Sequence, residues 1–155
     1  MAGKDDINPA VGGMLRAARE MLSHEHSVFR ALNLEPLMLG VGRSRFALDL
    51  PADFASGGSI YSGMLSMVLD SIMGMTVFTA LKEIKPIATI NLKTDYLRAA
   101  PAGGRVVCHA ACHAMRDDVA YVRGAIAAPD DAYEIAVAIG AFMIGTRARE
   151  KGSRL

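Results

Sequence analysis

The segment from Ser59 to Leu81, SIYSGMLSMVLDSIMGMTVFTAL, constrains the fold more than any other part of the chain. It is too long for an ordinary strand and contains neither proline nor an internal turn signal, so we predict a helix that is nearly surrounded by protein. Its only charged residue is Asp70. A buried carboxylate is rare unless it has a partner, so the role of Asp70 is the main question that the sequence raises.

Three interpretations of this segment remain open. A transmembrane helix has about this length, but Asp70 at its centre would cost roughly 2.5–3.5 kcal/mol, and strands of alternating polarity follow it. We therefore expect no membrane span. In the second interpretation Asp70 forms a purely structural hydrogen bond inside a soluble core. In the third it is a catalytic carboxylate in a pocket that admits little water.

The remaining patterns predict an α+β fold. An amphipathic helix is expected from Pro9 to about Leu32, a strand from about Leu37 to Leu50 and a loop over PADFASGG, residues 51–58. Four stretches of strand-like composition follow the long helix, separated by short turns that suit antiparallel hairpins: IATINLKTDYL, RVVCHAACHAM, VAYVRGAIAA and YEIAVAIGAFMIG, with RAAPAGG, RDD and PDDA between them. This order predicts an antiparallel sheet packed around one helix.

The composition is that of one soluble domain, with 155 residues of which 52% are hydrophobic and 21% charged. A formal net charge of +1 offers no broad basic surface, so we expect no nucleic-acid binding. The first residues, MAGKDDINPAVGG, lack the basic start and apolar run of a secretory signal, and the chain has only two cysteines. We therefore expect a cytoplasmic protein with reduced thiols.

Residues Tyr61–Gly74, YSGMLSMVLDSIMG, resemble the signature of the hotdog-fold acyl-CoA thioesterases of the PaaI type, the phenylacetic acid degradation thioesterase-like family. In that signature a His-Gly-Gly is followed by an acid and, four residues later, by a glycine. The similarity extends through IATINLKTDYLRAAP and spans roughly Leu37 to Arg147. It implies a hotdog fold, a curved antiparallel sheet around a long central helix, over residues 36–148. The resemblance does not account for the helical extension expected over 1–35 or for the basic tail over 149–155.

The resemblance also implies a site. The family's catalytic acid corresponds to Asp70, its oxyanion-binding backbone N–H to Ser62, next to Gly63, and a hydroxyl that helps to place the attacking water to Thr89. Tyr61 stands where the family usually has histidine, and Ala55 where a loop asparagine is often found. The implied activity is hydrolysis of acyl-CoA or acyl-carrier-protein thioesters, with Asp70 as general base or nucleophile and no cofactor besides the coenzyme A of the substrate.

Other residues carry weaker expectations. Met64 and Met67 could line an adaptable acyl pocket, although methionines on a buried helix are more often plain core. Arg98, like Arg147 and Arg149, could bind the phosphates of coenzyme A, although solvated surface arginines are the default. Two alternative functions stay open: a hotdog hydratase or dehydratase, which would typically need a histidine with its acid in the site, and a non-catalytic acyl-CoA-binding protein.

The motif CHAACH, Cys108 to His113, contains four side chains of the types that bind metal ions, but their spacing does not suit a metal site. In a strand the two cysteines point to one face and the two histidines to the other. Each same-side pair is also about 13 Å apart, too far to share one ion. We therefore predict no metal site here.

The spacing of the site residues predicts a homodimer. Ser62 and Asp70 are eight residues apart, about 12 Å along one helix, so a single thioester cannot touch both. The simplest source of the acid is the same helix of a second subunit, antiparallel across a two-fold axis. This arrangement gives two composite active sites per dimer, and two such dimers could form a tetramer.

Overall fold

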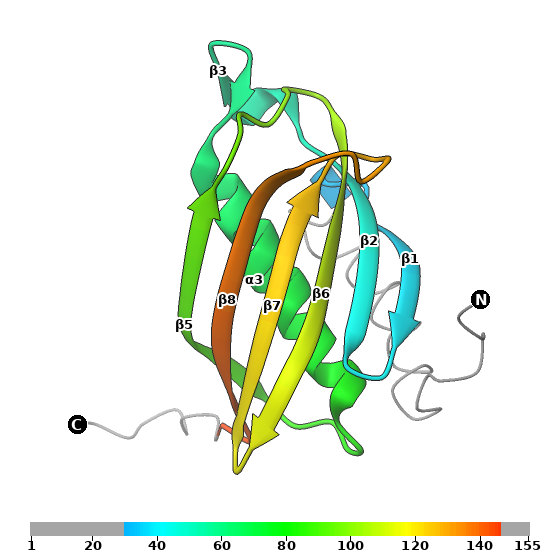
Figure 1. The fold of residues 1–155 in the computed structure, drawn as a ribbon, viewed down its shortest axis with the longest axis vertical. Coiled ribbons are helices and arrows are strands. Elements are labelled where there is room, and N and C mark those ends of the chain that lie inside the picture. Colours follow the sequence, from blue (N-terminus) through cyan, green and yellow to red (C-terminus); the bar gives the residue numbers. More distant parts are fainter. Residues whose placement is uncertain (1–29, 147–155) are drawn as a thin grey trace.

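A computed structural model of the chain describes residues 30–146 (Figure 1). The elements in this range are β1 (Glu35–Gly40), β2 (Arg43–Asp49), a 3-10 helix (Ala52–Phe54), β3 (Ala55–Ser56), β4 (Ser59–Ile60), α3 (Ser62–Ala80), β5 (Ile87–Tyr96), β6 (Arg105–Arg116), β7 (Val119–Ala127) and β8 (Glu134–Ile144). The helix expected from Pro9 to Leu32 lies almost entirely outside the described residues, as does the tail 149–155.

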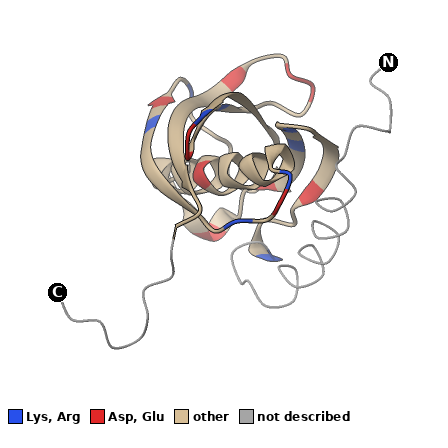
Figure 2. Cartoon of the chain, turned by 90° about the horizontal axis from the view of Figure 1, so that it is seen from below, with Lys and Arg blue, Asp and Glu red and all other residues tan. Residues whose placement is uncertain are grey.

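Six of the strands form one antiparallel sheet in the order β1-β2-β6-β7-β8-β5, and β3 pairs only with β4. Seen from below, the sheet curves around α3 (Figure 2). The predicted α+β hotdog fold is therefore confirmed. β5 and β1 are the two edge strands.

Two local predictions were wrong. The strand expected from Leu37 to Leu50 is a hairpin, because β1 and β2 are joined by a two-residue turn in which Gly42 has a φ of +65°. The expected loop 51–58 contains the 3-10 helix and the first strand of a short hairpin, β3 and β4, which turns at Gly57 and Gly58. Both of these glycines also have positive φ, a conformation that side chains with a Cβ rarely adopt.

The four strands after α3 lie where they were predicted, but they are not four successive hairpins. The β6–β7 and β7–β8 hairpins at RDD and PDDA are confirmed. The hairpin expected at RAAPAGG is wrong, because β5 pairs with β8 at one edge of the sheet and the chain then crosses to β6. This crossing leaves the outer edge of β5 without a strand partner among the described residues.

The core lies between α3 and the sheet, where the helix contacts β2, β5, β6, β7 and β8. Leu69, Ile72 and Met73 are almost completely inaccessible. The helix approaches β7 closely at Gly124, where an added Cβ would lie 2.9 Å from Cγ of Met73. A glycine at this position therefore sets the distance between helix and sheet.

By length and composition α3 could cross a membrane, but 56% of its most apolar 18-residue stretch is buried inside the protein. This burial, together with its contacts to five strands, is typical of the core helix of a globular domain. The helix is less enclosed than predicted, since one stripe along it is only half-buried. The stripe consists of Gly63, Met67, Asp70, Ser71 and Phe78.

Candidate active site

The start of α3 offers two free backbone donors. Tyr61 occupies the N-cap position, and no side chain in the described part of the chain caps the helix. Hydrogen bonds from the Ile60 N–H to Ala100 (3.0 Å) and from the Tyr61 N–H to Phe54 (2.9 Å) hold the preceding segment in place. The first amides of a helix have no intrahelical acceptor, and within residues 30–146 those of Ser62 and Gly63 have no other. The partial positive charge of the helix start adds to their capacity to bind an oxyanion.

Tyr61 lies against this first turn. Its side chain is 72% exposed, yet an added Cβ on Gly63 would lie only 2.5 Å from Cε1 of the tyrosine ring. The glycine therefore makes room for the ring beside the free amides. Tyr61 is thus placed to contact any group that is bound at the helix start.

Asp70 lies two turns further along α3, on the half-buried stripe. Thr89 of β5 donates a hydrogen bond of 2.8 Å from Oγ1 to Oδ1 of Asp70. The structure thus brings together two of the residues that the sequence singled out. No described residue bonds to Oδ2, so one carboxylate oxygen is oriented by Thr89 and the other is available for chemistry.

A group of hydroxyls that the sequence analysis missed lies between these two features. Ser66 Oγ is 2.6 Å from the hydroxyl of Tyr96 and donates to Thr94 Oγ1 at 3.2 Å. Because Ser62, Ser66 and Asp70 are spaced four residues apart, they lie on one face of the helix, next to β5. That spacing was the signal in the sequence that could have identified Ser66.

The other candidate residues are more dispersed. Met64 is buried in the core and Met67 is half-buried on the stripe beside Asp70. The guanidinium of Arg98 lies 5.3 Å from the centre of the Tyr133 ring, in a cation–π contact. Arg147 and Arg149 lie outside the described residues.

The CHAACH residues of β6 divide between the two faces of the sheet. Cys108 and Cys112 face the core, and burial raises the pKa of both thiols. His109 and His113 line a hollow on the outer face, away from α3. In the described part of the chain, no three His, Cys, Asp or Glu side chains come together as a possible metal site.

Comparison with solved structures finds the same fold in several proteins. A phenylacetic acid degradation-related protein of Ralstonia eutropha JMP134 is 23% identical, with a TM-score of 0.73 over 86% of this chain and 98% of that one. The Escherichia coli PaaI protein of the phenylacetic acid degradation operon is 15% identical, with a TM-score of 0.74 over 87% and 95% of the two chains. A Streptococcus mutans UA159 protein bound to acetyl CoA is 16% identical, with a TM-score of 0.68 over 81% and 99%.

Comparison of the sequence alone gives a family. No curated protein sequence matches the chain. The family model of the thioesterase superfamily matches residues 57–135, which contain the free amides, α3, Asp70 and Thr89. Since this match spans half of the chain, the protein belongs to the thioesterase superfamily.

Proposed function

We propose that the protein hydrolyses acyl-CoA thioesters to a free acid and coenzyme A. The observation that carries this proposal is the start of α3, where two amides that have no acceptor among residues 30–146 lie on the same helix as a half-buried carboxylate. An oxyanion donor and a base or nucleophile are the two groups that thioester hydrolysis needs. Acetyl CoA bound to the similar Streptococcus mutans protein supports the choice of thioester.

In the proposed mechanism the substrate carbonyl oxygen accepts a hydrogen bond from the Ser62 N–H, with Gly63 beside it. Asp70, held by Thr89, removes a proton from water as the water oxygen attacks the acyl carbon. The negative charge that develops on the carbonyl oxygen is stabilised by the free amides and the helix dipole. The tetrahedral intermediate then collapses, the C–S bond breaks, and the sulfur leaves with a proton as the thiol. Alternatively, the Asp70 carboxylate attacks the carbon itself, the C–S bond breaks and the thiolate of coenzyme A leaves and takes a proton from water, and a second water hydrolyses the resulting anhydride.

The two groups must come from different subunits. Eight helical residues separate Ser62 from Asp70, about 12 Å, whereas donor and attacking group must both lie close to one carbonyl carbon. The outer edge of the ten-residue strand β5 pairs with no strand in residues 30–146, and Ile90 on this strand is half exposed. An open strand edge of this kind is the type of surface on which two chains pair. A two-fold axis beside β5 would place Ser62 of one subunit opposite Asp70 of the other.

Two substitutions test the mechanism by release of free thiol from a panel of acyl-CoA substrates. We expect Asp70→Asn, which keeps the size of the side chain, to reduce hydrolysis by about a hundredfold or more. Ser62→Pro removes the N–H donor at the first helical position, where proline is well tolerated. The residue before a proline must be extended, and Tyr61 already has this conformation. Ser62→Ala is the matched control, because it keeps the N–H. A folded Asp70→Asn protein with near-normal turnover would refute the proposal, and coenzyme A binding without turnover in the wild type would indicate a non-catalytic binding protein.

Mixing the two inactive variants tests the composite site. After joint unfolding and refolding, half of the dimers should contain one chain of each kind, and each mixed dimer has one intact site. Activity should therefore return to roughly a quarter of the wild-type value for random pairing. If subunits exchange but the mixture stays as inactive as its parents, Asp70 does not act across the interface.

A single turnover in ¹⁸O-labelled water separates the two roles of Asp70. A general base delivers labelled oxygen to the product acid in the first turnover. A nucleophile transfers one of its own unlabelled oxygens to the product when water attacks the aspartyl carbonyl, and the label then appears in the protein.

A further inference from the structure

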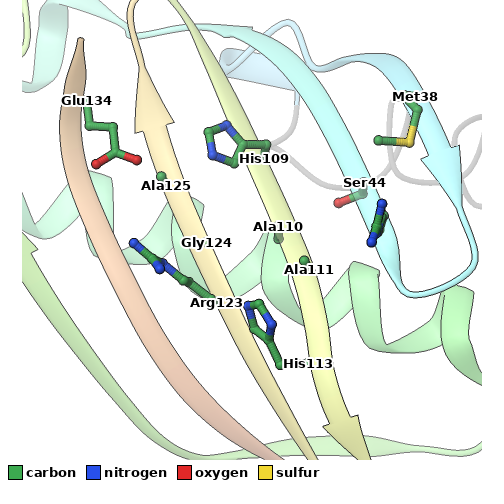
Figure 3. Close-up of a pocket in the computed structure, with 11 residues that line it drawn as sticks. Met38, Ser44, His109, Ala110, Ala111, His113, Arg123, Gly124, Ala125 and Glu134 are labelled. Carbon is green, nitrogen blue, oxygen red and sulfur yellow. The ribbon is translucent and has the colours of Figure 1, made fainter. Parts of the chain in front are cut away.

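The outer face of the sheet carries a hollow of about 320 Å³ across β2, β6, β7 and the start of β8 (Figure 3). Its floor is formed by Ala111 and Ala125, and its polar lining consists of Arg43, His109, His113, Arg123 and Glu134. Neighbouring Ala110 belongs to the core that packs on α3. Since successive strand residues face opposite sides, the hollow and α3 lie on opposite faces of the sheet.

The strand register explains why the hollow is basic. Arg43 pairs with Ala111, and Ala111 pairs with Arg123, so two arginines flank one alanine in a row across three strands. With neighbouring strands about 4.8 Å apart, the Cα atoms of the two arginines are about 10 Å apart, within reach of one small ligand. The alanine keeps the space between them open.

Among the residues that the structure describes, these two arginines have no ion-pair partner. The nearby Arg45 forms an ion pair with Asp131 at 2.5 Å, but neither Arg43 nor Arg123 has an ion pair or side-chain hydrogen bond within the described range. A guanidinium matches the geometry of a phosphate and is easily stripped of water. The hollow is therefore suited to an anion of the phosphate class.

Two further groups indicate more than a bare phosphate. Nδ1 of His109 is buried and has no hydrogen-bond partner in the part of the chain that the structure describes. The imidazole ring as a whole lines the hollow, where it can form a hydrogen bond with a hydroxyl group of a ligand. Glu134 adds a carboxylate, which repels phosphate but accepts hydrogen bonds from hydroxyl groups. Figure 3 shows Arg123, His109 and Glu134 around Ala125.

We propose that this hollow binds a phosphorylated sugar, with the phosphate on Arg43 and Arg123 and the sugar hydroxyls on Glu134 and His109. The volume of the hollow lies at the small end of the range for ligand pockets, which suits a ligand as small as a pentose phosphate. Two sources share this chemistry: a free sugar phosphate, and the phosphorylated ribose of coenzyme A. Because the hollow faces away from α3, the inference does not depend on the proposed hydrolysis.

The test is calorimetric titration of the full chain with ribose 5-phosphate, inorganic phosphate and ribose. We expect ribose 5-phosphate to bind with a Kd of about 1 mM or below, and Arg123→Gln to weaken this binding roughly tenfold or more. Glu134→Gln should weaken the binding of ribose 5-phosphate but leave the binding of inorganic phosphate unchanged. Arg116→Gln, which removes an exposed arginine outside the hollow, is the matched control and should have no effect.

Adenosine 3′,5′-bisphosphate distinguishes the two sources. Binding at least about tenfold tighter than that of ribose 5-phosphate would identify coenzyme A as the ligand, and equal or weaker binding would identify a free sugar phosphate. The proposal is overturned if neither compound binds, or if Arg116→Gln weakens binding as much as Arg123→Gln does.

Discussion

A buried pair of hydroxyls joins the sheet to the helix, and removing one of them should destabilise the protein more than removing the other. Ser44 of β2 and Thr76 of α3 are at most 1% exposed, and their hydroxyl oxygens are 2.6 Å apart. Thr76 Oγ1 also donates to the backbone carbonyl of Ile72 at 2.8 Å. Since a hydroxyl has a single proton, Ser44 must be the donor in the bond between the two side chains.

The two single substitutions therefore differ in cost. Thr76→Val removes the acceptor of Ser44 and leaves a buried hydroxyl unpaired, which should destabilise the protein by about 1–3 kcal/mol. Ser44→Ala removes only the donor, and Thr76 keeps its bond to Ile72, so a loss of about 0.5–1.5 kcal/mol is expected. In the Ser44→Ala background the additional cost of Thr76→Val should fall below its cost in the wild type.

Urea unfolding of the wild type, both single variants and the double variant, at one protein concentration, measures these free energies. A control titration at a second concentration shows whether subunit association contributes. If Ser44→Ala costs as much as Thr76→Val, or if the two effects are additive, the assignment of the proton to Ser44 is wrong.

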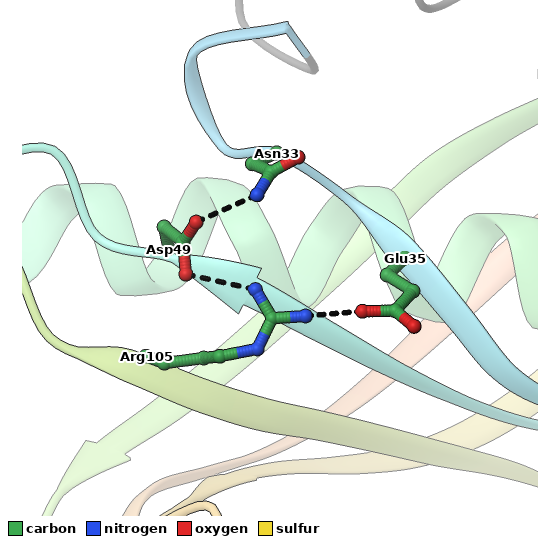
Figure 4. A network of polar contacts seen from close by, with 4 residues as sticks. All are labelled: Asn33, Glu35, Asp49 and Arg105. Carbon is green, nitrogen blue, oxygen red and sulfur yellow. Dashed lines mark hydrogen bonds and ion pairs between the residues drawn. The ribbon is translucent and has the colours of Figure 1, made fainter.

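Three further predictions concern acid stability, thiol reactivity and packing. A hydrogen bond from Asn33 and a further interaction with Arg105 lower the pKa of Asp49 in the folded protein (Figure 4). These contacts therefore stabilise the fold fully at a pH above 3.8, the ordinary pKa of the side chain, and the stabilisation disappears as the pH falls through the lower pKa of the folded state. Asn33→Ala should thus lower the thermal midpoint at neutral pH, with a difference from wild type that shrinks in acid. Because burial raises the pKa of Cys108, iodoacetamide should label it in urea but not in the native protein, as mass spectrometry can show. Gly124→Val should destabilise the protein by about 1–3 kcal/mol in urea, since the new side chain would overlap the helix.

The central helix could be predicted from the sequence because length alone separates it from a strand. The 23-residue segment Ser59–Leu81 encloses the observed helix, Ser62–Ala80, within three residues at its start and one at its end. The hairpin of β1 and β2 was missed because its turn consists of only two residues, Val41 and Gly42, and only the second of them is a turn-forming residue. Local periodicity identifies strands, but a turn of two residues hardly interrupts it.

The pairing of strands and the contacts that depend on it could not be predicted in the same way. β5 is followed by β6 but pairs with β8, and nothing in the composition of β5 encodes that partner. The hydrogen bond from Thr89 to Asp70 depends on this placement, as does the contact of Tyr96 with Ser66. The row of Arg43, Ala111 and Arg123 likewise requires the register of three strands, which is a property of the assembled sheet.

The crossing from β5 to β6 also determines when the chain can fold during synthesis. Arg43 of β2 pairs with Ala111, and Ile87 of β5 pairs with Ile144, near the end of the last strand. Of the five strands that pack on α3, only β2 precedes it in the chain. The apolar helix therefore leaves the ribosome before the other four strands have been synthesised. Long-range pairings of this kind slow folding and expose apolar surface in the meantime. A nascent chain that stops before β8 should therefore bind chaperones strongly, and release should follow once β8 closes the sheet.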